Sequence, residues 1–117
     1  MPKTNHERTM DEAIESALDC VRACQKCASA CLQEKDVDQL RECISLDMDC
    51  AEICSLTADL MSRNSSYHAQ ACQLCAEICD GCAAECEKHK HMDHCRECAK
   101  SCRRCAEACR SMASALV

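Results

Sequence analysis

The stretch of sequence that decides the fold is residues 72–109, which read CQLCAEICDGCAAECEKHKHMDHCRECAKSCRRCAEAC. Its cysteines form two sets of five, and within each set the spacing alternates between three and four residues. Residues spaced in this way lie on one face of an α-helix, which apolar side chains usually occupy to form a core. The stretch therefore predicts two helices whose core faces are lined by thiols. The first carries Cys72, Cys75, Cys79, Cys82 and Cys86, and the second carries Cys95, Cys98, Cys102, Cys105 and Cys109.

The same spacing extends to the first half of the chain. Residues 10–34 carry Cys20, Cys24, Cys27 and Cys31, and residues 36–63 carry Cys43, Cys50 and Cys54. Thr9 with Glu12 has the pattern of a capping box, and Asp36 is expected to cap the second helix. Residues 66–89 and 92–115 are the other two predicted helices. We therefore expect one all-α domain over residues 1–117, an up-down-up-down four-helix bundle with a cysteine-lined core.

The composition limits the compartment and the partners. The formal net charge is −6 at pH 7, which argues against a nucleic acid or an anionic membrane surface as partner. The N-terminal residues lack the apolar segment of a signal peptide, and no apolar run reaches the about 20 residues that cross a membrane. We therefore expect a cytoplasmic protein. Because the cytosol keeps thiols reduced and 17 cysteines cannot all pair, complete disulfide pairing is not expected.

If all four cysteine stripes face one axis, the thiols fall into approximate layers along it. A rise of about 1.5 Å per residue, counted from the end that holds the first and third turns, predicts five layers. In order, they contain Cys31, Cys43, Cys86 and Cys95; Cys27, Cys82 and Cys98; Cys24, Cys79 and Cys102; Cys20, Cys50, Cys75 and Cys105; and Cys54, Cys72 and Cys109. Asp47 lies near the gap that residues 36–63 leave in the middle layers. A surface position is favoured for Asp47 over a role as accessory ligand or hydrogen-bond partner.

Charge favours one metal for this column. Thiolates select Cu(I), Zn(II) or iron–sulfur clusters. A Zn²⁺ ion held by four thiolates leaves a charge of −2 at each site, which is costly in a core. One Cu(I) per thiolate is neutral, and neighbouring cysteines on one helix can bind a two-coordinate ion. Multiple Cu(I) ions are therefore favoured. A protein that sequesters Zn(II) or another soft metal, an iron–sulfur protein, a disulfide framework, a thiol redox protein and a metal-free core remain alternatives.

The two ends of the bundle differ in composition. His89, His91, Met92 and His94 cluster at the third turn, where imidazole and thioether groups can capture copper and pass it inward; an ordinary polar turn is the alternative. The opposite end carries apolar residues that we expect to close the column: Ile14, Leu18, Leu56, Leu60, Met61, Met112 and Leu116. His6 and His68 lie at this closed end and are expected to face solvent.

Two helices carry more apolar surface than a monomer needs. The second apolar face of residues 10–34 consists of Ile14, Leu18, Val21, Ala28 and Leu32, and that of residues 36–63 consists of Val37, Leu40, Ile44 and Met48. Such surplus faces favour self-association, although a wide intramolecular stripe also explains them.

With its four cysteine stripes and its histidine-rich third turn, the chain resembles the bacterial four-helix-bundle copper storage proteins of the cytosolic type. The resemblance covers nearly the whole chain. It implies copper storage without enzymatic turnover, Cu(I) ligation by all 17 cysteines named above, and assembly as a homotetramer. The exported members of the family carry a signal peptide, and the cytosolic members do not.

Overall fold

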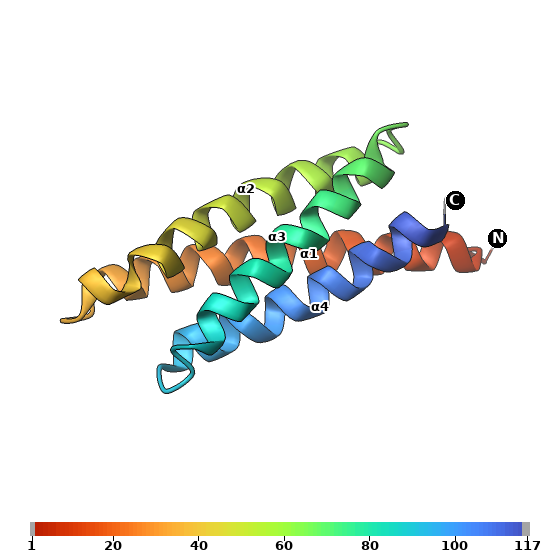
Figure 1. Ribbon diagram of the computed structural model, residues 1–117. Coiled ribbons are helices and arrows are strands. Elements are labelled where there is room, and N and C mark those ends of the chain that lie inside the picture. Colours follow the sequence, from red (N-terminus) through yellow and green to blue (C-terminus); the bar gives the residue numbers. More distant parts are fainter. Residues whose placement is uncertain (1, 116–117) are drawn as a thin grey trace.

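The computed structural model describes residues 2–115, and the side chains as far as residue 113. The described residues form four α-helices, α1 (Asn5–Leu32), α2 (Arg41–Ser62), α3 (His68–Glu87) and α4 (Asp93–Ala115), with a short 3₁₀ helix η1 (Val37–Leu40) before α2 and no strand. Consecutive helices run in opposite directions (Figure 1). The predicted all-α, up-down-up-down bundle with a cysteine-lined core is confirmed.

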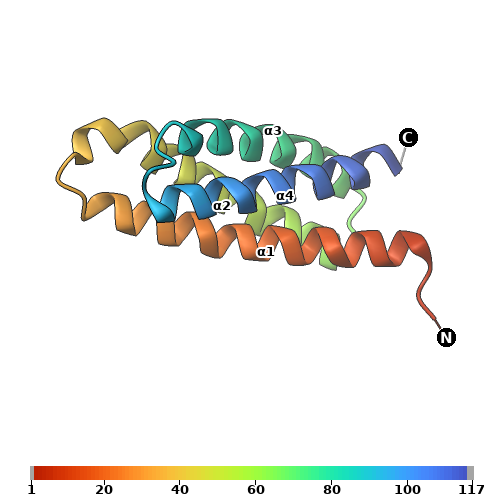
Figure 2. The ribbon, with the colours of Figure 1, turned by 90° about the horizontal axis from the view of Figure 1, so that it is seen from below.

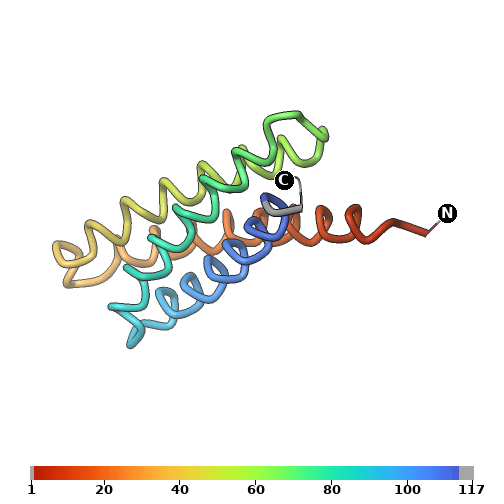
Figure 3. Tube along the Cα trace, turned by 45° about the vertical axis from the view of Figure 1, so that its right-hand side comes forward, coloured from red at the N-terminus to blue at the C-terminus, as the bar shows by residue number. Residues whose placement is uncertain are grey.

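The helices lie at the corners of an elongated bundle with principal extents of 52 × 23 × 19 Å. Helix α1 packs against α2 and α4, and α3 packs against the same two helices, so that α1 and α3 are diagonal. The α1–α2 and α3–α4 turns share one end, and the α2–α3 turn lies at the other end with the two termini (Figure 1). The Cα trace shows the N-terminal turns of α1 extending past the other helices (Figure 3).

Helix α1 begins five residues earlier than the sequence predicted. Thr4 is its N-cap: the Glu7 backbone N–H donates to Thr4 Oγ1 at 3.1 Å, and the Thr4 backbone N–H donates to Glu7 Oε1 at 3.3 Å. The prediction that Thr9 and Glu12 form the capping box is wrong, and Thr9 Oγ1 instead donates to the Asn5 carbonyl at 2.8 Å. Two Thr-x-x-Glu patterns occur in this segment, and the earlier one adds a further turn of backbone hydrogen bonds.

The start of the second helix also differs from the prediction. Asp36 makes no side-chain capping bond, and η1 occupies residues 37–40 before α2 begins at Arg41. This tighter winding places Leu40 in the core with 1 % of its surface exposed. Leu40 therefore belongs to the core and not to a surplus outer face. Burial of an apolar side chain favours the observed turn over an extra turn of α-helix.

The α2–α3 turn has a well-defined backbone geometry. Asn64 follows the helix in the left-handed region, with φ 53°. The Ser65 N–H donates to the Leu60 carbonyl at 2.9 Å and the Asn64 N–H to the Met61 carbonyl at 3.0 Å, which is the Schellman pattern of helix ends. This turn fixes the position of the Ser65 carbonyl at the start of α3.

Ion pairs on the surface connect neighbouring helices. Arg103 of α4 pairs with Asp80 at 3.0 Å and with Glu87 at 2.8 Å, both on α3, and Arg104 pairs with Asp19 of α1 at 3.0 Å. Exposed pairs of this kind contribute about 0–1 kcal/mol each, so the bundle depends mainly on its core. Within residues 2–115, none of the helices combines the length and apolar character that crossing a membrane requires.

Candidate metal centre

The 17 cysteines line the axis of the bundle. Each is at most 1 % exposed, and none forms a disulfide. They occupy the positions at which a helical bundle normally carries leucine or isoleucine, because a spacing of three and four residues keeps them on the inner face of each helix. The inward-facing stripes that the sequence predicted are therefore present on all four helices.

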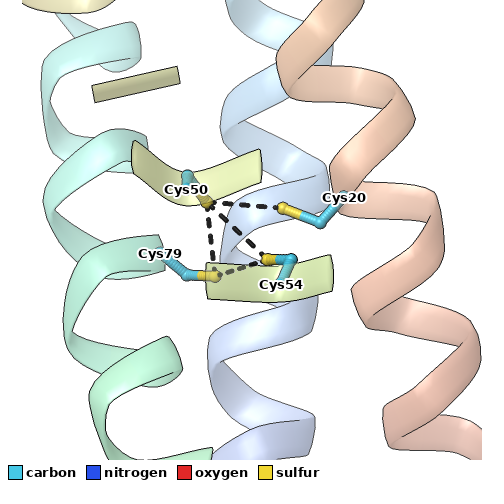
Figure 4. Close-up of side chains that lie close together, drawn as sticks. All are labelled: Cys20, Cys50, Cys54 and Cys79. Carbon is cyan, nitrogen blue, oxygen red and sulfur yellow. Dashed lines mark hydrogen bonds between the residues drawn. The ribbon is translucent and has the colours of Figure 1, made fainter. Parts of the chain in front are cut away.

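The thiols of different helices come close to one another in the middle of the bundle. Cys20 of α1, Cys50 and Cys54 of α2, and Cys79 of α3 have sulfur atoms that all lie within 4.8 Å of one another (Figure 4). Cys50 Sγ is 3.5 Å from Cys79 Sγ and 3.7 Å from Cys20 Sγ, and Cys54 Sγ is 3.6 Å from Cys79 Sγ. Three helices thus contribute to one cluster of four soft ligands.

Clusters of this kind repeat along the axis and share members. Further groups of four sulfurs, again within 4.8 Å of one another, are Cys27, Cys31, Cys43 and Cys95; Cys24, Cys82, Cys98 and Cys102; Cys20, Cys24, Cys50 and Cys102; and Cys54, Cys75, Cys79 and Cys105. Because one sulfur belongs to several groups, the thiols form a continuous column. Such a column suits ions that share bridging thiolates.

The predicted layers are correct in outline, including Cys43 of α2, but wrong for Cys54. Cys54 Sγ lies 3.7 Å from Cys75 and 3.8 Å from Cys105, so Cys54 belongs with these residues and not with Cys72 and Cys109. The α1–α2 connection extends beyond the α3–α4 turn (Figure 2). Cys54 therefore lies nearer to that end of the bundle than a common origin for the two turns predicts.

Asp47 fills the gap in the thiol stripe of α2. It is fully buried, and its Oδ1 accepts hydrogen bonds from Cys82 at 3.2 Å, Cys98 at 3.3 Å and Cys86 at 3.7 Å. The favoured expectation of a surface charge is wrong, because Asp47 lies four residues after Cys43 and three before Cys50 on the inner face. Burial raises the pKa of Asp47 to about 12. The carboxyl is therefore neutral in the metal-free protein at neutral pH.

His94 is the residue of the third turn that reaches the thiols. Its Nδ1 lies 3.5 Å from Cys95 Sγ, 3.7 Å from Cys31 Sγ and 3.8 Å from Cys27 Sγ, and its Nε2 hydrogen-bonds to Glu34 Oε2 at 3.0 Å. Burial lowers the pKa of His94, but the hydrogen bonds with Cys27 and Glu34 raise it by more, so this pKa lies above its usual value. The Glu34 bond directs the Nδ1 lone pair toward the column.

The other three residues of the turn make no hydrogen bond to a thiol within the described part of the chain. His89 is partly buried, with Nε2 3.3 Å from Glu85 Oε2, and its ring meets that of exposed His91 edge-on at 6.5 Å between centroids. Met92 is partly buried and packs against the core. Among the four residues of this turn, His94 is distinguished by its contacts with thiols.

The end opposite this turn matches the prediction only in part. Met61 and Met112 are buried, and Ile14 packs against the core, but Leu18 and Leu56 are 53 % and 50 % exposed and do not close the column. Leu60 is half-buried, and Leu116 lies outside the described residues.

The two histidines at this end have different environments. His6 is exposed, as expected. The expectation that His68 faces solvent is wrong: it is 6 % exposed, because it lies four residues before Cys72 on the inner face of α3. The sequence signal for this burial is the spacing: His68 lies four residues before Cys72 and so continues the cysteine stripe of α3 by one helical turn.

Burial raises the pKa of two thiols beside the α3–α4 turn, called here the mouth of the column. It is the main reason that the pKa of Cys31 is raised, and it contributes most to raising the pKa of Cys95 to about 11. A thiolate at these positions therefore needs a cation to balance it, and metal binding must release the thiol proton.

Four antiparallel helices around a continuous column of buried thiols define a class of protein, the four-helix bundle with a thiol core that binds soft metal ions. The chain belongs within this class to the copper storage protein family, whose model matches residues 6–114. The family that the sequence resembles is thus the family to which the chain belongs.

Relatives and solved structures agree with this assignment. The chain is 46 % identical over 94 residues to the uncharacterized cysteine-rich protein YhjQ of Bacillus subtilis (strain 168), covering 80 % of this chain and 86 % of that protein. A cytosolic copper storage protein of Streptomyces lividans, solved during copper loading with five coppers, is 41 % identical with a TM-score of 0.89, covering 93 % and 95 % of the two chains. The Cu(I)-bound copper storage protein BsCsp3 is 46 % identical with a TM-score of 0.85, covering 90 % and 98 %.

Proposed function

We propose that this protein stores and buffers Cu(I) in the cytosol, as a binding protein without turnover, and that its 17 cysteines are the ligands. The observation that carries the proposal is the continuous column of buried, unpaired thiols, in which sulfurs from neighbouring helices lie 3.5–4.0 Å apart. The related structure from Streptomyces lividans is described as cytosolic and as binding copper, which supports the same role here.

Charge supports Cu(I) over Zn(II) in this column. The clusters share sulfurs and lie in a dry core, so four thiolates around each Zn²⁺ would leave adjacent sites with uncompensated negative charge. Each Cu(I) that replaces one thiol proton leaves the core neutral, and shared sulfurs can bridge successive ions. A redox role is not favoured, because a thiol that exchanges with external disulfides must be accessible, whereas these thiols are buried.

Copper is proposed to enter at the α3–α4 turn. His91 is exposed, His89 and Met92 are partly buried, and His94 contacts three thiols. Groups that can bind copper are therefore available from the surface of the turn to the thiols that His94 contacts. Imidazole and thioether are neutral ligands that bind Cu(I) less tightly than thiolates do, which allows transfer inward. We expect replacement of His89, His91 and His94 with alanine to slow loading without reducing the final capacity.

Asp47 is proposed as an accessory group of the column. Its Oδ1 lies where a fourth sulfur would lie among Cys82, Cys86 and Cys98, and its Oδ2 has no partner among the described residues. When copper displaces the thiol protons, Oδ1 loses its three donors. A direct bond to Cu(I) or a hydrogen bond from a protonated carboxyl to a thiolate would then satisfy Asp47.

Assembly into a homotetramer is also part of the proposal. Leu56 of α2 and Ile78 of α3 line a hollow of about 340 Å³, and Leu74 lies one turn before Ile78 with 48 % of its surface exposed. These three residues form an apolar patch, called here the α2–α3 patch. Exposed apolar patches of this kind are typical of protein–protein contacts.

An anaerobic titration of the fully reduced protein tests the proposed function. We expect binding to approach one Cu(I) per cysteine, and Zn(II) to bind in far smaller number and to be displaced by Cu(I). Saturation at a few Cu(I) ions, or a preference for Zn(II), would contradict the proposal.

A further inference from the structure

The inner stripes of three helices continue past their last cysteines with other soft donors. At the end with the α2–α3 turn, His68 precedes Cys72 by four residues on α3, Met61 follows Cys54 by seven on α2, and Met112 follows Cys109 by three on α4. His68, Met61 and Met112 are 6 %, 1 % and 0 % exposed. An imidazole and two thioethers therefore occupy the places where the stripes would carry further thiols.

Met61 contacts the last thiol of α3 directly. The Cys72 thiol donates to Met61 Sδ at 3.7 Å. Because His68 lies four residues from Cys72 on the same helix face, their Cβ atoms are neighbours at about 5–6 Å. Cys72 thus contacts a thioether from α2 and shares its helix face with the imidazole of His68, one turn before it on α3.

The protonation of the His68 ring follows from its hydrogen bond. Nδ1 lies 2.6 Å from the Ser65 carbonyl oxygen, which can only accept, so Nδ1 carries the proton. In the neutral ring, Nε2 then carries a lone pair. Nε2 is buried and has no hydrogen-bond partner among the residues that the structure describes. A buried acceptor without a donor is unfavourable, and a metal ion is one group that can satisfy it.

The α2–α3 turn holds this ring in place before any metal binds. The Schellman pattern around Asn64 fixes Ser65, whose carbonyl accepts from both the backbone N–H of His68, at 3.1 Å, and the ring. Histidines that bind metals typically donate the other ring N–H to a carbonyl or carboxylate. His94 has the corresponding arrangement at the mouth, with its Nε2–H bonded to Glu34 and its Nδ1 facing thiols.

We infer that Cys72, Met61 and His68 form a terminal Cu(I) site that closes the thiol column at the end opposite the mouth. This inference rests on the proposed function, because it assumes that the column binds Cu(I). Charge supports the donor set: one thiolate balances one Cu(I), and the thioether and the imine nitrogen are neutral ligands. Cys72 is the cysteine of α3 nearest the α2–α3 turn, so no further thiol of this helix can bridge to an ion at that end. The thioether and the imidazole therefore complete the coordination of the Cu(I) bound there.

Two neutral donors make this site weaker than those formed by thiolates alone, so we expect it to fill last. The test compares His68→Leu and Met61→Leu with His6→Leu and Met48→Leu, which change exposed residues. With Cu(I) added anaerobically in competition with a chelator, the two core variants should lose about one of the weakest equivalents and retain the others. The two controls should match the parent protein.

Ring ¹⁵N spectra of the parent protein report on His68 directly. We expect an unprotonated Nε2 in the metal-free protein, and a change in its chemical shift only with the final Cu(I) equivalents, while the His6 signals stay constant. An Nε2 signal that does not move at saturation, or an unchanged number of weak equivalents in His68→Leu, would overturn the terminal site.

Two further results distinguish a terminal copper site from a purely structural His68 and from a failure of the proposed function. The metal-free His68→Leu variant should unfold at the same or a higher temperature, because leucine removes the unsatisfied nitrogen; a lower temperature with an unchanged copper count would show that His68 is only structural. If the parent protein itself binds only a few Cu(I) ions, the proposed function fails. If it fills its thiols normally and the His68 spectrum stays unchanged, the terminal site alone fails.

Discussion

At the scale of single residues, Asp47 and His94 are the polar groups that the thiol column places under the greatest constraint. Asp47 is fully buried without a cation beside it, and His94 is held between three thiols and Glu34. The protonation of each therefore depends on whether copper is present. Both make predictions that a single substitution can test.

Asp47 should make the stability of the metal-free protein depend on pH. Between pH 5 and 8 the native carboxyl, with its pKa raised to about 12, keeps a proton that the unfolded carboxyl, with an ordinary pKa of about 4, has lost. Because the native state binds more protons, the free energy of unfolding falls as pH rises, by at most about 1.4 kcal/mol per pH unit. Asp47→Asn should flatten this dependence and be the more stable protein at pH 8.

Urea unfolding of the reduced, metal-free proteins at pH 5, 6.5 and 8 measures this difference. The raised pKa of His94 contributes to both proteins equally. Asp49→Asn, which changes an exposed carboxylate on the same helix, is the matched control and should retain the parent slope. An Asp47→Asn variant with the parent pH dependence would show that the buried carboxyl is ionised in the native state.

His94 should control the rate of copper loading. Among the copper-binding groups of this turn, His94 Nδ1 is the one that contacts thiols. We therefore expect His94→Ala to slow the uptake of Cu(I) several-fold and to leave the final number of ions nearly unchanged. Stopped-flow absorbance of the Cu(I)–thiolate bands measures this rate. His91→Ala, at the exposed edge of the same turn, should have a smaller effect. Equal rates for His94→Ala and the parent protein would place the entrance elsewhere.

At the scale of secondary-structure elements, the turns decide where each cysteine stripe meets the others. The α1–α2 connection contains a 3₁₀ helix and a buried Leu40, and it moves α2 along the bundle relative to α3 and α4. The α2–α3 turn ends α2 with a left-handed residue and positions Ser65 for His68. These two connections determine which thiols become neighbours.

Asn64 should tolerate glycine better than alanine. With φ 53° it adopts a conformation in which a Cβ is costly, although asparagine accepts it more readily than most residues. We expect Asn64→Ala to lower the free energy of unfolding of the metal-free protein by about 1 kcal/mol, and Asn64→Gly to leave it nearly unchanged. Chemical unfolding measures both values. Equal losses for the two variants would indicate that the asparagine side chain, and not the backbone, stabilises the turn.

At the scale of the whole molecule, the core is an unusual environment for metal ions because 17 buried thiols line its axis. Small thiols fill an elongated bundle less completely than leucine would, and copper can occupy the remaining space between sulfurs. Binding of Cu(I) in the core therefore changes both the protonation of the thiols and the stability of the entire fold.

Copper loading should release protons and become weaker at low pH. Each Cu(I) replaces one thiol proton, and burial raises the pKa of Cys31 and Cys95. We expect about one proton per Cu(I), and an apparent dissociation constant that rises about tenfold for each unit by which the pH falls. A pH indicator in weak buffer counts the protons, and chelator competition at pH 6 and 7 gives the affinities. A proton count near zero would mean that the thiols are already ionised.

The α2–α3 patch should determine the assembly state. Leu56→Glu replaces an apolar side chain beside Ile78 with a further negative charge in a hollow that Asp49 and Glu52 also line. We therefore expect it to dissociate the proposed homotetramer at micromolar concentration, as measured by sedimentation velocity. Ser55→Glu adds the same charge at an adjacent exposed position and should leave the assembly intact. A parent protein that sediments as a monomer would remove the proposal of self-association.

Much of this architecture was predictable because the relevant information is periodic. A cysteine every three or four residues specifies the inner face of each helix wherever the helix begins, so the bundle and its thiol lining follow from spacing alone. The first capping box was missed because two Thr-x-x-Glu patterns compete in one segment. His68 was assigned to solvent although it continues the stripe of α3, since a polar residue beyond the last cysteine resembles an ordinary helix start.

The sequence by itself determined the class of fold and the inward direction of the 17 thiols, because helical periodicity is a local property of the chain. The family followed from the resemblance of its cysteine stripes and histidine-rich turn to a known family. Only the tertiary structure decided that Asp47 is buried among Cys82, Cys86 and Cys98, that Cys54 lies beside Cys75, and that the buried Nε2 of His68 has no hydrogen-bond partner among the described residues. These features depend on how far each helix slides along its neighbours. The turns and the side-chain packing set that displacement, and a stripe of equally spaced cysteines fits several alignments.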